Sequence, residues 1–345
     1  MTFISDKKNN KDSMPDETGE RDIIQLDDKK WGVVTSLRVF ISLVLIGILV
    51  VLVDPVKVKQ SISGFNSSCL PVVFGLIALS MVISAMKWKV FLDVQNNRID
   101  LIQLFRIYVI SLFFNNFLPS SIGGDGVRIY LAGRYYGKTS SAAASVVVER
   151  AIATITLSLL GLSAALFASN PTMIVVWPLI IVLISGVVLT LILLTGWTPG
   201  FIKKRKGKVR DSWIAFSHAA GRLRKEHAAL FMNLILSLVF QVNVAMVVAS
   251  IIWGLGLPVP GFADMIFITS TSSVIAMIPA GINGYGLREG AYIFLLQPHG
   301  FSSSSALTVS VLFAFFVSIF SLAGGIDWII SKKKYKYLEN NEAII

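Results

Sequence analysis

The sequence predicts an all-α polytopic membrane protein, and three observations support this prediction. Of the 345 residues, 54% are hydrophobic and 15% are charged, and the mean hydropathy is +0.71, which soluble domains do not sustain. The apolar residues form blocks of about 17 or more, the length at which a helix crosses about 30 Å of hydrocarbon. No block alternates apolar and polar residues at period two, so a membrane β-barrel is excluded.

The polar segment of residues 1–36 mixes Asp and Glu with Lys and lacks the apolar core of a signal peptide, so we expect a cytoplasmic tail. A second cytoplasmic tail, residues 332–345, begins with basic residues. The predicted apolar blocks between the tails are Leu37–Val53, Leu70–Leu92, Leu101–Leu118, Ala142–Ala168, Met173–Leu194, Ala228–Leu255, Ala263–Ile278 and Ala306–Ile330.

The charges of the loops indicate which blocks cross the membrane. Residues 197–227 contain nine Lys and Arg residues, which predicts a cytoplasmic loop, whereas residues 169–172, 256–263 and 297–304 contain none and are predicted outside. If all eight blocks crossed from a cytoplasmic N-terminus, the basic loop would lie outside. Two blocks are therefore predicted not to cross. The net charge of +11 is explained by such membrane-flanking loops and anionic lipid, so no nucleic-acid partner is expected.

Two similar segments identify the blocks that do not cross. Phe117-Leu-Pro-Ser-Ser-Ile-Gly-Gly-Asp-Gly-Val-Arg128 follows the third block, and Met277-Ile-Pro-Ala-Gly-Ile-Asn-Gly-Tyr-Gly-Leu-Arg288 follows the seventh. We call them the first and second signature. They align without a gap at a constant offset of 160 positions, as between Pro119 and Pro279. The same offset superposes the neighbouring blocks, so the chain contains an internal repeat.

Each signature is predicted to be the tip of a re-entrant hairpin, at about 101–135 and about 263–297. The first hairpin then opens to the cytoplasm and the second to the outside, and six full spans remain. This arrangement makes residues 37–168 and 169–331 inverted-topology repeats. Transporters use inverted repeats for alternating access, with the substrate near the membrane midplane where broken helices meet.

The signatures contain groups suited to a phosphate. Pro119 and Pro279 break their helices, and each following half-helix points backbone N–H groups towards the break. Arg128 and Arg288 lie near the starts of these half-helices, and an arginine fork matches a phosphate. We therefore predict that both arginines bind the headgroup of an anionic phospholipid or polyprenyl-linked lipid. The predicted backbone cradle consists of Gly123, Gly124, Gly126, Asn283, Gly284 and Gly286.

The alternative is purely structural: the glycines permit close packing, and the arginines pair with Asp125 and Glu289. Recurrence of the same Pro, Ile and Arg in both halves favours binding. Asn115 and Asn116 precede the first break, where they either cap freed carbonyls or line the cavity.

Glu149 and Arg150 lie within an apolar block and are expected to pair with other helices rather than with each other. Glu149 is expected to be the partner of an arginine or to carry a coupling proton.

The signatures resemble the transmembrane region of lysylphosphatidylglycerol synthases, also called the flippase-like family. The resemblance rests on Asn116-Phe-Leu-Pro-Ser-Ser-Ile-Gly-Gly-Asp-Gly-Val-Arg128, Val148-Glu-Arg150 and Ile278-Pro-Ala-Gly-Ile-Asn-Gly-Tyr-Gly-Leu-Arg-Glu-Gly-Ala291, and it covers about residues 35–332. It implies movement of an aminoacylated phosphatidylglycerol across the membrane, while a separate soluble domain makes that lipid. The sequence ends soon after the last block, so we expect a stand-alone member without the aminoacyl-transfer domain.

These observations together predict a lipid translocase of the cytoplasmic (inner) membrane with both termini in the cytoplasm. No cofactor, metal site or catalytic residue is predicted. One alternative is a lipid-modifying enzyme or an accessory of a glycolipid-pathway transferase, in which Glu149, Asp125 or Glu289 would supply an acid or base. Another is a scaffold that recruits a separate soluble lipid synthase through residues 197–227, whose Trp213 and Phe216 among basic residues resemble an interfacial helix.

Overall fold

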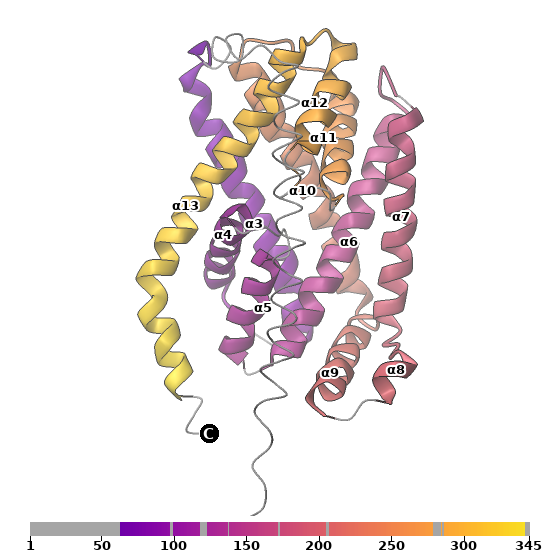
Figure 1. The fold of residues 1–345 in the computed structure, drawn as a ribbon, viewed down its shortest axis with the longest axis vertical. Coiled ribbons are helices and arrows are strands. Elements are labelled where there is room, and N and C mark those ends of the chain that lie inside the picture. Colours follow the sequence, from indigo (N-terminus) through magenta and orange to yellow (C-terminus); the bar gives the residue numbers. More distant parts are fainter. Residues whose placement is uncertain are drawn as a thin grey trace, which may run out of the picture.

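The computed structural model describes residues 63–96, 99–117, 123–136, 138–171, 173–204, 207–278, 284 and 286–341. All regular elements in these ranges are helices (Figure 1). They are η1 (Ser67–Cys69), α3 (Leu70–Val94), α4 (Leu101–Phe117), α5 (Gly123–Tyr136), α6 (Thr139–Ala165), α7 (Met173–Leu194), α8 (Gly200–Lys203), α9 (Lys208–Leu223), α10 (His227–Gly254), α11 (Phe262–Ala276), α12 (Leu287–Leu296), η2 (Gln297–His299) and α13 (Ser303–Asn341).

Five of the described helices are long and apolar enough to cross a membrane, so the predicted all-α polytopic class is confirmed. Their candidate spans are Ser67–Val94, Thr139–Ala165, Met173–Leu194, His227–Gly254 and Ser303–Ser331. Each agrees with a predicted block to within a few residues. The predicted block Leu37–Val53 and the tail of residues 1–36 lie outside the described residues.

Two pairs of shorter helices contain the signatures. α4 and α11 are apolar but too short to count as candidate spans, and each ends shortly before the proline of its signature. α4 packs on α5, and α11 packs on α12. The first pair lies in the half of the molecule that contains α9 and the end of α13, and the second pair lies in the opposite half (Figure 1).

The two halves of the chain make reciprocal contacts. α3 packs along α10, which is the helix 160 positions further on. α4 packs on α13, and its counterpart α11 packs on α6, the counterpart of α13. Between α3 and α10, the Asn243 amide donates to the Ser80 hydroxyl at 2.7 Å, and the Asn233 amide donates to the Lys87 carbonyl at 2.9 Å. Polar contacts of this kind hold helices together where hydrocarbon offers no hydrophobic drive between them.

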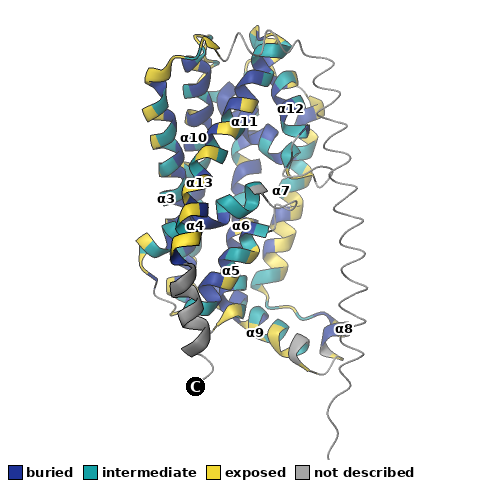
Figure 2. Ribbon diagram, turned by 60° about the vertical axis from the view of Figure 1, so that its left-hand side comes forward, coloured by how far each residue is buried: buried dark blue, intermediate teal, exposed yellow. Residues whose placement is uncertain are grey.

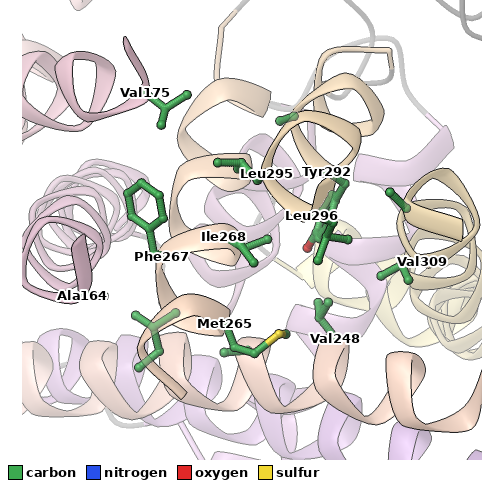
Figure 3. Close-up of a cluster of buried hydrophobic side chains, with 14 of the residues drawn as sticks. Ala164, Val175, Val248, Met265, Phe267, Ile268, Tyr292, Leu295, Leu296 and Val309 are labelled. Carbon is green, nitrogen blue, oxygen red and sulfur yellow. The ribbon is translucent and has the colours of Figure 1, made fainter. Parts of the chain in front are cut away.

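Buried and exposed residues divide as expected for helices that contact each other and lipid. The inner sides of the helices are buried (Figure 2), whereas α7 exposes large apolar side chains such as Ile174, Trp177 and Ile181. Among the described residues, the core cluster with the most members surrounds α11 and α12 and includes Phe267 and Leu295 (Figure 3). A second cluster, around Trp88 and Leu131, fills the half that contains α4 and α5.

The basic segment of residues 197–227 contains α8 and α9. One side of α9 buries Ala219, Ala220 and Leu223 against the bundle, whereas Arg222 is exposed. Cys69 ends η1 and immediately precedes α3, whose start lies at the end of the molecule opposite α9, and it is only 1% exposed. The native thiol is therefore an unsuitable probe for labelling from outside, because a reagent cannot reach it.

Candidate functional site

A cavity of about 310 Å³ lies where the two signature helices end, and we call it the central cavity. Its wall is built by α3, α4, α6, α10 and α11, so both halves of the chain contribute. Asn115 near the end of α4 and Met277 at the end of α11 both line it. Its charged lining residues are Lys87, Glu149 and Arg150. The volume lies within the range of small-molecule sites.

Five charged side chains form a chain of alternating sign beside this cavity: Lys87, Glu149, Arg128, Asp125 and Arg150. Lys87 Nζ lies 3.4 Å from Glu149 Oε1, and Glu149 Oε2 accepts a short hydrogen bond from Arg128. Lys87, Glu149 and Arg128 are each at most 3% exposed. Burial of ions is costly unless each is paired, and here each pair offsets that cost. This charge chain, as we call the five side chains, has three cations and two anions. Its two terminal cations, Lys87 and Arg150, line the central cavity.

Aromatic side chains complete the setting of Arg128. Its guanidinium carbon lies 4.0 Å from the ring centroid of Tyr108 and 4.5 Å from that of Trp88. The Tyr108 hydroxyl donates to both carboxylate oxygens of Glu149 at 3.0 Å, and the Trp88 indole donates to Ser145 at 2.9 Å. Arg128 is thus held by cation–π contacts as well as by carboxylates.

Asp125 joins the two arginines that lie at its sides. It accepts two hydrogen bonds from Arg150, Nε to Oδ2 at 2.9 Å and Nη2 to Oδ1 at 2.8 Å, and one from Arg128 at 3.2 Å. A two-point arginine–carboxylate contact fixes both orientation and position. Unlike Arg128, the Arg150 side chain is 53% exposed.

Arg288, the last residue of the second signature, also lies beside a carboxylate. Arg288 Nη2 lies 3.3 Å from Glu289 Oε1, and Glu289 Oε2 accepts the Gly286 N–H at 2.6 Å. The Ser310 hydroxyl donates to Glu289 at 3.4 Å, and Arg288 lies over the Phe313 ring at 5.9 Å. Neither Arg288 nor Arg128 lines the central cavity. The structure therefore does not bring the two predicted headgroup-binding arginines together at this cavity.

Two backbone N–H groups of the predicted cradle, those of Gly124 and Gly286, already donate to side chains of the protein. The Gly124 N–H donates to Asn115 Oδ1 at 2.8 Å, and the Gly286 N–H is taken by Glu289. A Cβ on Gly124 would lie 2.5 Å from the Ser111 carbonyl oxygen, so this glycine permits close packing of α5 on α4. Gly284 has φ +73°, and its Cβ would lie 2.7 Å from that of Ala276. Gly124 therefore meets a packing requirement, and Gly284 meets both a packing and a conformational requirement.

Other predicted positions are distributed as follows. Gly123 begins α5, and a Cβ on Gly126 would meet open space. Asn116 donates from its amide to Ser321 on α13 at 3.1 Å, whereas Asn115 both caps α5 and lines the cavity. The predicted pairings of Arg128 with Asp125 and of Arg288 with Glu289 are both present, and Glu149 and Arg150 do pair with other helices. Pro119, Pro279 and Asn283 lie outside the described residues.

Sequence reasoning missed Lys87, Tyr108 and Trp88. Lys87 lies inside the predicted block Leu70–Leu92, where an ionisable residue costs enough free energy to indicate a functional position. The same argument that selected Glu149 would have selected it. Tyr108 and Trp88 give no comparable signal, because aromatic residues in an apolar helix are ordinary packing residues.

Residues 36–325 match the family described as the lysylphosphatidylglycerol synthase TM region. The chain belongs to this family. The match spans most of the chain and includes both signatures and all five residues of the charge chain. No curated protein matches the chain in sequence. The family relates the protein to lipid synthesis or lipid movement in a membrane.

Proposed function

We propose that this family member translocates an anionic phospholipid or a lipid-linked intermediate between the leaflets of the cytoplasmic membrane, with both termini in the cytoplasm. The observation that supports this best is the central cavity. It lies where α4 and α11 end, it has walls from both halves, and its charged lining comprises two cations and one anion. A phosphate diester suits such a lining.

Within this proposal, α4–α5 and α11–α12 are re-entrant hairpins of two inverted repeats. Their placement in opposite halves of the molecule and the reciprocal helix contacts support that interpretation. Alternating access then opens the cavity to one leaflet through one hairpin and to the other leaflet through the other.

Lys87 is the residue we propose to contact the headgroup first. Its ammonium carries three donors, and Glu149 is the one carboxylate within ion-pair distance among the described residues. It can therefore keep this pair and donate to a phosphate oxygen as well. Arg150 is committed to Asp125 through two hydrogen bonds, but its half-exposed side chain leaves room for a second acceptor. Arg128 acts as a positioning residue that holds Glu149.

The test is leaflet exchange of labelled phosphatidylglycerol and a labelled polyprenyl phosphate in proteoliposomes. Lys87→Gln is expected to lower exchange about ten-fold or more, since a hydrogen bond to a charged group is lost. Lys87→Arg should restore exchange at least in part. Lys89→Gln is the matched control, because Lys89 lies one half-turn further along α3 and pairs with Asp93 outside the cavity.

Equal exchange by wild type and folded Lys87→Gln protein would remove the assigned role of Lys87. No exchange of either lipid by folded wild type contradicts the translocase proposal. Chemical conversion of a labelled lipid in the same vesicles would instead support the alternative of a lipid-modifying enzyme.

A further inference from the structure

Two further cavities, which are separate from the central cavity, lie beside α9. One, which we call the interfacial groove, has a volume of about 730 Å³ and an almost wholly apolar lining that includes Ala143, Val147, Leu193, Trp213 and Phe216. The other, which we call the basic pocket, has a volume of about 570 Å³ and is lined by Lys138, His218 and Arg222 among hydroxyl residues.

The two cavities are continuous, because Thr139 and Ser140 at the start of α6 line both. The basic pocket contains two basic side chains, Lys138 and Arg222, and no carboxylate in its lining. An apolar groove that ends in a cationic pocket matches a molecule with a hydrocarbon chain at one end and an anion at the other. Neither a soluble anion nor a neutral lipid uses both parts.

The surroundings place this pair of cavities at a membrane surface. α9 lies at one end of the bundle (Figure 1), with basic residues exposed and an apolar side against α6 and α7. Trp213 is half-buried in the groove, and tryptophan favours the boundary between headgroups and acyl chains. Basic residues near that boundary attract anionic lipid.

One side of α6 leads from the groove to the central cavity. Ala143 and Val147 line the groove, and Arg150 and Thr154 line the central cavity. These positions are spaced by four, three and four residues, which places them on one face of a helix. Val147 and Arg150 are separated by about 4.5 Å along the helix axis.

We propose that the interfacial groove and the basic pocket form a loading site for an anionic phospholipid of the leaflet on the α9 side. One acyl chain lies in the groove against Trp213, the phosphate lies between Lys138 and Arg222, and the lipid proceeds along the Val147 face of α6 towards the central cavity. The binding site stands by itself, whereas its loading role rests on the proposed function.

Quenching of tryptophan fluorescence by brominated acyl chains tests the binding site. The full chain is placed in phosphatidylcholine bilayers with a minor fraction of brominated phosphatidylglycerol, or of brominated phosphatidylcholine. The difference between wild type and Trp213→Phe isolates the Trp213 signal. Trp213 should be quenched at lower fractions of the anionic lipid than of the neutral one.

Charge variants sharpen this test. Lys138→Gln and Arg222→Gln should each weaken the preference for phosphatidylglycerol about five-fold, since each removes one cation near the headgroup. Arg222→Lys should preserve it. Arg224→Gln is the matched control, because it removes the same charge from the same segment but does not line the basic pocket. Equal quenching by both lipids, absence of Trp213 quenching, or insensitivity to Lys138→Gln and Arg222→Gln overturns the site.

The loading role needs a separate readout. Val147→Phe places a larger side chain on the path along α6 between the interfacial groove and the central cavity. It should abolish leaflet exchange while Trp213 quenching persists. Exchange by this variant at the wild-type rate overturns the loading role but not the binding site. Loss of all exchange in wild type with preferential quenching intact contradicts the proposed function and leaves the binding site standing.

Discussion

The two signatures share a sequence pattern but are embedded in different environments. Arg128 is fully buried within a chain of five charges, whereas Arg288 is 15% exposed and pairs with its own neighbour Glu289. The positions 160 residues beyond Lys87, Trp88, Tyr108 and Glu149 are occupied by Val247, Val248, Ile268 and Val309, which are all buried apolar residues.

Figure 3 shows what replaces the charge chain in the second half: Val248, Ile268 and Val309 belong to its apolar core. The two signatures are therefore each flanked by a packed helix pair, α4 with α5 and α11 with α12, while among the described residues the buried charge chain lies beside the first pair. We infer that the first half supplies the charged part of the site and the second half supplies a packed counterpart against which it can move.

The largest expected effect concerns the sidedness of the two hairpins. In a Cys69→Ala background, Asp100→Cys lies just before α4 and Val259→Cys just before α11, and both positions are exposed. A membrane-impermeant maleimide should label Val259→Cys in intact cells and Asp100→Cys only after the membrane is opened. Ser68→Cys, which is exposed at the end opposite α9, is the control and should label from outside. Labelling of both hairpin positions from one side would falsify the inverted arrangement.

Removal of the carboxylate that pairs with each signature arginine, Glu149 or Glu289, should give unequal losses of stability. Glu149→Gln leaves Lys87 buried without its carboxylate partner and leaves Arg128 with Asp125 alone, which costs about 3–5 kcal/mol of unfolding free energy. Glu289→Gln keeps an acceptor for the Gly286 N–H and loses one pair, which costs about 1 kcal/mol. Denaturant unfolding in detergent measures both.

The double variant Lys87→Met with Glu149→Gln is the control for this explanation. It removes a cation together with the anion and should recover part of the stability that Glu149→Gln loses, because an uncompensated buried ion is the source of the loss. Equal destabilisation by the two single carboxylate variants would contradict the proposed asymmetry of the halves.

For the signature glycines, the larger loss of stability is expected in the second signature. Gly124→Ala brings a methyl group against α4 and should cost about 1–3 kcal/mol of overpacking. Gly284→Ala meets Ala276 in the same way and also requires a side chain at φ +73°, which adds about 1–2 kcal/mol. Gly126→Ala and Gly290→Ala meet open space and serve as controls in the same unfolding assay. A loss from Gly124→Ala larger than that from Gly284→Ala would contradict this order.

Much of the fold could be predicted because hydrocarbon imposes simple rules. Block length predicted the five described spans. The distribution of Lys and Arg indicated that two blocks do not cross, and the two similar signatures singled out the blocks that correspond to α4 and α11. Glu149 was recognised because a charge within an apolar block is costly. The partner of Glu149 depended on packing: nothing in the sequence separates Arg128 from Arg288, yet burial between Trp88 and Tyr108 places only Arg128 beside it.

The partners of the backbone N–H groups in the signatures could not be predicted from the sequence. A glycine-rich break followed by a helix has the same sequence pattern whether its N–H groups face a ligand or a neighbouring side chain. The Gly124 N–H donates to the Asn115 side chain rather than facing a ligand, because α5 packs on α4. Contacts of this kind depend on tertiary geometry, so periodicity and spacing cannot predict them.

The smallest expected effect concerns how the two half-helices are capped. α5 is capped by Asn115 from the preceding helix, whereas α12 is capped by Glu289 from its own first turn. Loss of a cap costs about 1 kcal/mol, or about a five-fold faster amide exchange where local opening controls exchange. Asn115→Ala should therefore accelerate hydrogen exchange in the first turn of α5 alone, and Glu289→Ala in that of α12 alone.

Asn115→Asp keeps an acceptor for the Gly124 N–H and is the control for the first case. The comparison is informative because Asn115 also lines the central cavity, so its cap ties the start of α5 to the end of α4 at the site itself. Among the described residues, the hydrogen bonds of Glu289 join it to Gly286, Arg288 and Ser310, and none of these lies on α11. If Asn115→Ala also accelerates exchange in α12, the half-helices are coupled across the cavity, and the view of a chemically active first half opposed by an independent packed counterpart is wrong.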